Sequence, residues 1–273
     1  MRLLSAFLAL FATCGLSQDA REIVRRSVEL DRDNWIKRAD YTWVGHSRER
    51  HFDSHDRVTS DHRETWEVFI LDGLPFTRTT ERDGKPLPPA EQRKQQQKLD
   101  KDTAKLESES PEEKQRRAAE FEKSRRRERA FLLELPDAFD LRLEGSDTVD
   151  GQDVWVVSGV PKPGYRAKSR DGAALAKIRG KMWIEKAGYQ WVRVEAETTE
   201  TISFGVFLAR LNPGAKLVLE QTRITGELWL PKREYMIGKG RIALFKRIAE
   251  DEEITWTDYK KFQVDSRIVP RDP

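Results

Sequence analysis

Hydrophobic residues recur along the chain with two different spacings, one typical of a helix and one typical of strands. In "REIVRRSVELDRDNWIKRA", residues 21–39, apolar side chains recur at helical spacing among charges, which predicts one amphipathic helix. From Asp40 onward the period changes to two, and "YTWVGHSRER", "ETWEVFILDG" and "PFTRTTERDG" predict three strands. Asp72-Gly73 separates the last two and Asp83-Gly84 ends the third, as tight turns do. We therefore expect a helix followed by an antiparallel meander.

The two-residue period returns at residue 139 and continues almost to the end. In "YQWVRVEAE", Val192, Val194 and Ala196 are expected on one face and the charged residues between them on the other, so one face is buried and one faces water. The segments predicted as strands are "FDLRLEG", "QDVWVVSGV", "GKMWIEKAG", "YQWVRVEAETTE", "ISFGVFLARL", "AKLVLEQTRIT", "ELWLPKREYMIG", "GRIALFKRIAE" and "EITWTDYKKFQV".

About twelve strands in one domain set the fold class, because a twisted sheet of that size does not stay flat and open. We predict a mainly β, α+β protein in which an antiparallel sheet of about 11–12 strands curls into a half-barrel covered by helices. The first helix is the natural cover for the concave side.

A polar segment at about residues 86–130 interrupts the strands. As one helix, Pro89 to Arg129 would be roughly 60 Å long, longer than the domain itself. A break is expected at "SESPEEK", where Ser110 caps a new helix, Pro111 takes its first position and Glu113 completes a capping box. Two interpretations stay open: a solvated charged insertion, or a mobile cover over the mouth of the barrel.

The N-terminus predicts export. Arg2 precedes an apolar run from Leu3 to Ala12 that is too short to span a bilayer, and small residues follow, so residues 1–17 are expected to be a signal peptide cleaved before Gln18. The alternative is a lipid anchor on Cys14, the only cysteine, but Thr13 precedes it where such signals have a small residue. We expect a periplasmic protein whose residues 18–273 form a single domain.

These features together resemble the LolA/LolB-like superfamily of bacterial envelope proteins. The resemblance rests on the order of elements and on "DGKPLPPAE", "GKMWIEKAGYQWVRVEAE" and "EITWTDYKKF". It implies an unclosed barrel of about eleven strands, lined by apolar side chains with helices as a lid, that holds acyl chains of a lipid or lipoprotein. The insertion here is longer and more charged than the short apolar lid of the carriers, which is a departure from the family pattern.

The composition limits the classes of function that we expect. The chain has 50 Lys and Arg against 47 Asp and Glu, a formal net charge of +3 spread along its length, so a nucleic-acid partner is not expected. The sequence contains neither a nucleophile elbow nor a Gly-rich phosphate loop, so we expect no enzyme and no cofactor.

Seven tryptophans fall inside predicted strands, where they either fill a core or line an apolar pocket. The candidates for lining a pocket are Trp183, Phe204, Val206, Leu208, Leu217, Leu219, Trp229 and Leu244.

Four histidines, His46, His51, His55 and His62, lie in "HSRERHFDSHDRVTSDH" among three aspartates. Imidazoles and carboxylates are ligands for zinc or copper, but this spacing fits no known motif and a solvated hairpin explains it equally well. We expect no tight metal site.

The sequence thus predicts a non-enzymatic envelope protein that binds a lipid or lipoprotein acyl chain and is at most peripheral to a membrane. The alternative is an envelope sensor or protein-interaction module with the same fold and a protein partner.

Overall fold

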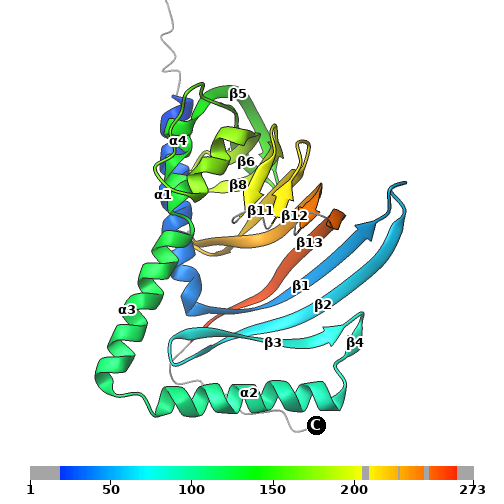
Figure 1. Cartoon of the computed structure of the whole chain (residues 1–273). Coiled ribbons are helices and arrows are strands. Elements are labelled where there is room, and N and C mark those ends of the chain that lie inside the picture. Colours follow the sequence, from blue (N-terminus) through cyan, green and yellow to red (C-terminus); the bar gives the residue numbers. More distant parts are fainter. Residues whose placement is uncertain (1–18, 205–208, 227, 243–245, 263–273) are drawn as a thin grey trace, which may run out of the picture.

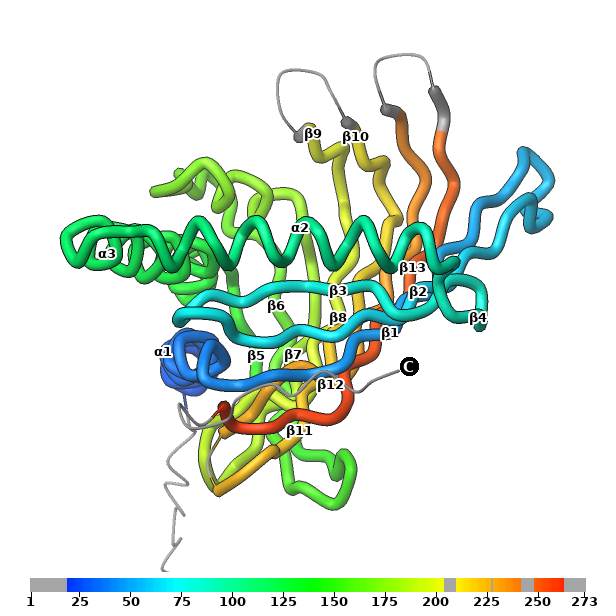
Figure 2. The backbone as a smooth tube through the Cα atoms, turned by 90° about the horizontal axis from the view of Figure 1, so that it is seen from below, coloured from blue at the N-terminus to red at the C-terminus, as the bar shows by residue number. Residues whose placement is uncertain are grey.

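A computed structural model describes residues 19–204, 209–226, 228–242 and 246–262. The described residues form a 13-stranded sheet in the order β4-β3-β2-β1-β13-β12-β11-β8-β7-β6-β5 (Figure 1), with the short β10 paired to β12 and β9 paired to β10 (Figure 2). The predicted signal peptide, residues 1–17, lies outside the described residues. The strands are β1 Tyr41–Phe52, β2 Val58–Leu71, β3 Leu74–Arg82, β4 Lys85–Pro86, β5 Phe139–Val149, β6 Gln152–Pro161, β7 Ile178–Glu185, β8 Trp191–Thr198, β9 Ile202–Phe204, β10 Ala209–Leu211, β11 Lys216–Thr225, β12 Leu228–Ile242 and β13 Lys246–Lys261.

The sheet is antiparallel, curled and unclosed. β4 and β5 stand at its two ends, and neither pairs with the other. Between them the sheet bends around a layer of helices (Figures 1 and 2). The predicted α+β half-barrel is confirmed.

Helix α1, Ala20–Lys37, lies on the concave side, as its apolar stripe predicted. Ile23, Val24 and Val28 are at most 1% exposed and pack with strand residues such as Ile184. Burying each of these side chains stabilises the fold by about 1.5–3 kcal/mol. The helix is therefore part of the core.

Buried polar contacts also hold α1 in place. Asn34 donates a hydrogen bond to the Gln190 side chain at 2.7 Å, and Gln221 donates one to Asp31 at 2.7 Å. Arg129 completes the group through an ion pair with Asp31 at 2.8 Å, and its guanidinium stacks on the Trp35 ring. These contacts join α1 to the sheet and to the end of the polar insertion.

The polar insertion forms two helices, α2 Pro89–Glu107 and α3 Pro111–Glu128, which we call the arm. Their break carries the predicted capping box, with Glu113 N–H donating to the Ser110 hydroxyl at 3.2 Å. The Gln95 side chain both accepts from Thr79 N–H and donates to Thr79 C=O, so α2 covers part of the free edge of β3 (Figure 2). None of the described helices combines the length and the apolar character that crossing a bilayer requires.

Two predictions about strand boundaries were wrong. Residues 202–211, expected as one strand, hold the paired β9 and β10, and the last three predicted strands are the two long strands β12 and β13. One predicted strand was expected to end at residue 238 and the next to begin at Gly240, but Gly240 lies inside β12, where a Cβ would come within 2.1 Å of the Arg210 carbonyl oxygen. This glycine is needed because β10 approaches closely there.

Candidate functional site

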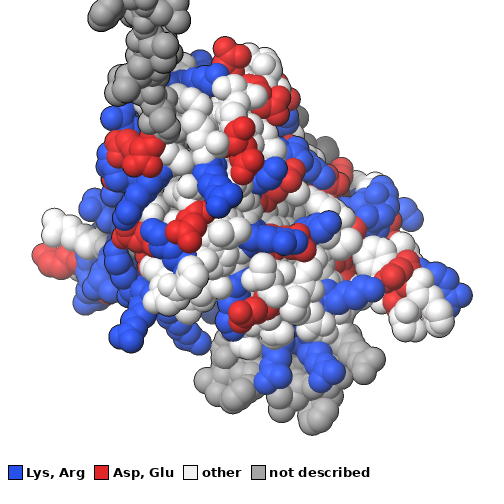
Figure 3. Space-filling model, turned by 90° about the horizontal axis from the view of Figure 1, so that it is seen from above, with Lys and Arg blue, Asp and Glu red and all other residues white. Residues whose placement is uncertain are grey.

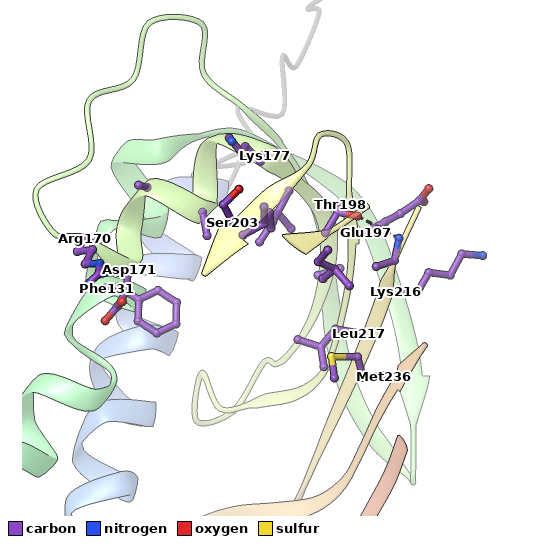
Figure 4. Close-up of a pocket in the computed structure, with 17 residues that line it drawn as sticks. Phe131, Arg170, Asp171, Lys177, Glu197, Thr198, Ser203, Lys216, Leu217 and Met236 are labelled. Atoms are coloured by element: carbon purple, nitrogen blue, oxygen red, sulfur yellow. Dashed lines mark hydrogen bonds between the residues drawn. The ribbon is translucent and has the colours of Figure 1, made fainter. Parts of the chain in front are cut away.

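A cavity of about 640 Å³ lies between the concave face of the sheet and a helical cover (Figure 4). Its floor is a row of three side chains on adjacent strands, Ala196 of β8, Leu217 of β11 and Met236 of β12, which are opposite one another in the register. Val194 lies two residues from Ala196 on the same face of β8, and Leu219 lies two residues from Leu217 on the same face of β11. Both pack against the α1 cluster, so the row of floor residues faces inward.

The cover comes from short 3-10 helices. Phe131 of η2, Ala130–Glu134, closes one side, and Ala173 and Ala174 of η3, Asp171–Lys177, lie over the floor. Alanines occupy the space where larger side chains would fill the cavity. The lining is therefore mainly apolar with room left between its walls.

The side chain of Thr198, in the end wall of the cavity, is hydrogen-bonded within the protein. Thr198 donates its hydroxyl hydrogen to the Asn212 carbonyl at 2.8 Å and accepts a hydrogen bond from the Ala215 amide at 3.0 Å. Ile202 and Leu211 complete the wall. An apolar ligand there leaves no polar group of this threonine unpaired.

One buried carboxylate anchors the cover. Glu134 is 5% exposed and accepts hydrogen bonds from the Tyr165 hydroxyl, the Ser169 hydroxyl and, at 2.8 Å, the Lys168 amide. Burial acts to raise the pKa of Glu134, but these hydrogen bonds outweigh it and hold the pKa below its usual value. Gly172 lies against the same carboxylate, where a Cβ would be 2.5 Å from an oxygen, so the start of η3 fits closely over Glu134.

The rim of the cavity carries more positive than negative charge. Arg170, Lys177 and Lys216 are cationic, whereas Asp171 and Glu197 are acidic, and Glu197 is paired with Arg179 at 3.1 Å. Lys216 points away from the cavity, while Arg170 and Lys177 lie on its cover side (Figure 4). Lys177 donates to the Thr201 carbonyl at 2.9 Å, and Arg170 has no carboxylate partner among the described residues.

The apolar floor ends at Met236. The same register row continues through Glu252 of β13 and Glu49 of β1. Burial first, and then the charges of Glu49, Glu234 and Glu250, raise the pKa of Glu252. Burial likewise raises the pKa of Glu234, which Arg129 partly offsets. The apolar part of this register row is thus confined to β8, β11 and β12.

Of the pocket residues predicted from sequence, Leu217 lines this cavity. Leu219 packs against the α1 cluster, and Trp229 is 3% exposed within a separate cluster. Trp183 packs against that second cluster and donates its indole N–H to Asp147 at 3.3 Å. Phe204 ends β9. Val206, Leu208 and Leu244 lie outside the described residues.

Sequence reasoning missed the cover. In "DGAALAK" the alanines show neither a strand period nor large apolar side chains, so they gave no sign of a cavity wall. The arm was one candidate for the cover, but the lining residues include none from α2 or α3. Instead, η2 and η3 supply it.

The four histidines do not converge on one point. His46 is near Thr65 at 3.2 Å, His55 contacts Ser54, and His62 lies 3.9 Å from Asp83. His51 lies between Glu49 and Glu250, with one ligand atom of each within 4.8 Å of the others. The absence of a tight metal site stays a prediction.

Comparisons with known proteins give structural matches only. The chain matches no protein-family model and no curated protein. A putative outer membrane lipoprotein-sorting protein domain from Vibrio parahaemolyticus is 11% identical, with a TM-score of 0.36 over 90% of this chain and 95% of that one. A LolA superfamily protein from Nitrosomonas europaea is 12% identical, with a TM-score of 0.35 over 92% and 94%.

A third solved structure to which the chain is similar is the Pseudomonas aeruginosa MucA/MucB complex, at 12% identity and a TM-score of 0.25 over 87% and 93%. Lipoprotein-sorting and LolA-superfamily structures are thus among those to which this chain is similar.

Proposed function

We propose that this chain is a non-enzymatic binding protein of the cell envelope that holds a lipid or lipoprotein acyl chain in the cavity between Leu217 and η3. The observation that carries the proposal is the cavity itself. Its volume of about 640 Å³ lies within the roughly 300–1,000 Å³ of small-molecule sites, and its floor, wall and cover are mainly apolar.

The chemistry of the lining favours a hydrocarbon. Each methylene moved from water into an apolar site contributes about 0.8 kcal/mol. The floor row Ala196, Leu217 and Met236 offers only hydrocarbon and a thioether, and the end wall leaves no polar group of Thr198 to direct a polar ligand. An elongated apolar ligand meets these conditions.

The rim favours an anionic head on that ligand. Arg170 and Lys177 lie on the cover side, and Asp171 is the acid beside them. A carboxylate or phosphate at the rim gains charge-assisted hydrogen bonds from arginine or lysine. We therefore expect fatty acids to bind more tightly than alcohols of the same chain length.

The same proposal includes export. A signal peptide over residues 1–17, with cleavage before Gln18, would deliver the single domain 18–273 to the periplasm. Intact-mass measurement of the envelope-localised protein tests this. A mature chain beginning at a diacylated Cys14 would overturn the cleavage site and make the protein lipid-anchored.

Adjacent residues of β11 provide the test of the site. Leu217 lines the cavity and Val218 faces the other side of the sheet, so each is changed to Lys in a separate variant. Titration with a fluorescent palmitate analogue should show binding to the wild type and to V218K, and at least about tenfold weaker binding to L217K, because a charge is costly in an apolar site. Equal affinity of L217K and the wild type would reject the cavity as the site.

The second candidate is an envelope sensor or protein-interaction module, and one observation favours it. Among the described strands, β5, Phe139–Val149, pairs with β6 alone, so its outer edge offers backbone groups to an added strand of a partner. Native mass spectrometry of gently purified protein separates the two candidates: co-purified lipid supports the carrier, and a bound protein supports the sensor.

A further inference from the structure

The outer surface of α2 carries a stripe of lysines. Lys94, Lys98, Lys101 and Lys105 follow one another at i, i+4, i+7 and i+11, and all four are exposed. At 3.6 residues per turn they fall within an arc of about 60° along about 16 Å of helix. Among the described residues none of the four has a carboxylate within ion-pair distance. The stripe is therefore a continuous line of lysines that form no ion pair among the described residues.

The contacts of α2 keep this stripe outward. Gln95 is bonded to the backbone of β3, and Leu106 on the same side is 7% exposed. The acids of α2 are partly engaged elsewhere, since Glu91 pairs with Arg82 at 3.0 Å and Asp100 accepts from Gln96 at 2.8 Å. The helix thus presents its lysines to solvent without ion pairs among the described residues, with Asp102 as the acid beside Lys98 and Lys105 at helical spacing.

The cations of α3 differ between its inward and its outward side. Its inward cations have partners: Arg117 pairs with Glu109 at 2.7 Å, and Arg125, only 8% exposed, pairs with Glu122 at 2.9 Å. Lys123, Arg126 and Arg127 are exposed and form no ion pair among the described residues, and exposed Arg116 is attracted by the Glu113 carboxylate without an ion pair in the same part of the chain. Seen from above, Lys and Arg gather along the edge of the molecule where α3 lies (Figure 3).

Helix stability explains only some of these cations. Positive side chains near a helix C-terminus complement its dipole, but that effect falls off within the last turn. Lys105 and Arg127 lie in last turns, whereas Lys94, Lys98 and Arg116 do not. The excess charge along the rest of the arm needs another explanation.

We propose that the outer surface of the arm docks on a lipid bilayer rich in anionic headgroups. Lysines are flexible point charges on long stems, which suit a plane of phosphates without fixed spacing, and each contributes about 1 kcal/mol near an anionic surface. The arm contains one aromatic residue, Phe121, which lies beneath the Arg125 guanidinium. The outer surface therefore lacks the stacking groups that single-stranded nucleic-acid sites use.

This docking goes beyond the proposed acyl-chain binding and does not depend on it. The arm contributes no residue to the cavity, so a ligand-free protein is expected to bind vesicles equally well. Salt is expected to weaken docking, because exposed charges more than a Debye length apart are screened.

Vesicle co-sedimentation tests the proposal. The full chain is mixed at low salt with phosphatidylcholine vesicles, with and without phosphatidylglycerol. We expect binding only to the anionic vesicles, and K94Q/K98Q/K101Q/K105Q should lower the partition coefficient at least about tenfold. The matching Lys→Arg variant should retain binding, and far-UV circular dichroism checks that α2 is intact in each variant.

A second variant tests whether vesicle binding depends on the arm or only on the total charge of the protein. R142Q/R166Q/K181Q/K260Q removes four exposed cations that lie outside the arm and have no ion-pair partner among the described residues. It should leave the partition coefficient within about twofold of the wild type. An equal loss in both variants, equal binding of neutral and anionic vesicles, or tighter binding of duplex DNA than of the anionic vesicles would each overturn the proposal.

Discussion

Glu252 and Glu49 lie directly opposite each other on β13 and β1, in the register row that begins with the apolar floor of the cavity. Two carboxylates in directly opposite positions of an antiparallel pair repel each other. Burial and this repulsion raise the pKa of Glu252, so the concave face changes from apolar to acidic within two strands.

Replacing Glu252 by Gln should therefore stabilise the protein by about 0.2–1 kcal/mol at neutral pH. A carboxyl whose pKa is raised in the folded state destabilises the fold above its ordinary pKa of 4.5 and has no such effect well below it. Urea unfolding should show the gain at pH 7 and its disappearance at about pH 3. A variant less stable than the wild type at pH 7 would mean that Glu252 has a favourable partner.

Glu134 should show the opposite dependence on pH. Its pKa is lowered in the folded state, so its contribution to stability is present above its ordinary pKa of 4.5 and is lost as the pH falls through the lower folded value. We expect E134Q to lower the free energy of unfolding by about 1–3 kcal/mol at pH 7 and by much less at about pH 3. D171N, on the exposed side of the same cover, serves as the control, and equal effects of both variants would contradict the anchoring role.

The predictable part of the fold is the part carried by local pattern. The Ser110–Glu113 capping box and the stripe of α1 were readable because they depend on neighbours three or four positions away. The break expected between the strands ending at residue 238 and beginning at Gly240 was wrong, because Gly240 answers the approach of Arg210, thirty residues earlier in the chain, and does not end a strand. Only the tertiary structure contains that reason.

The cavity was less predictable than the sheet. Alternation placed Leu217 and Leu219 on the same face, but it told neither which face is inward nor which inward residues a cover leaves free. Val194 and Val192 were expected on one face, yet a register shift between Trp183 and Ile184 places Val192 in a different cluster. A cavity is space left by small residues such as Ala173 and Ala174, which have no sequence period.

Arg129 should be far more important to stability than its neighbours in the arm. Removing its charge in R129Q leaves the buried Asp31 carboxylate with Gln221 alone, and breaking a buried pair in this way typically costs about 3–5 kcal/mol. The control R126Q changes an exposed residue and should fall within about 0.5 kcal/mol of the wild type. Thermal and urea unfolding measure both, and equal stability of the two variants would contradict this role for Asp31.

Zinc should not bind tightly at the histidines. Glu49, His51 and Glu250 offer three ligand atoms, but all three residues are partly exposed, and the group holds no fourth ligand among the described residues. Calorimetric titration should show weak binding that H51A barely changes. A single site of sub-micromolar affinity lost in H51A would contradict this prediction.

The most direct test of acyl-chain binding is a series of fatty acids from octanoate to stearate, measured by displacement of a fluorescent palmitate analogue. If the cavity beside Leu217 holds the chain, each added methylene should tighten binding roughly three- to fourfold until the cavity is full, and the affinity should then level off. Affinity that does not change with chain length, or the absence of binding throughout the series, would contradict the account.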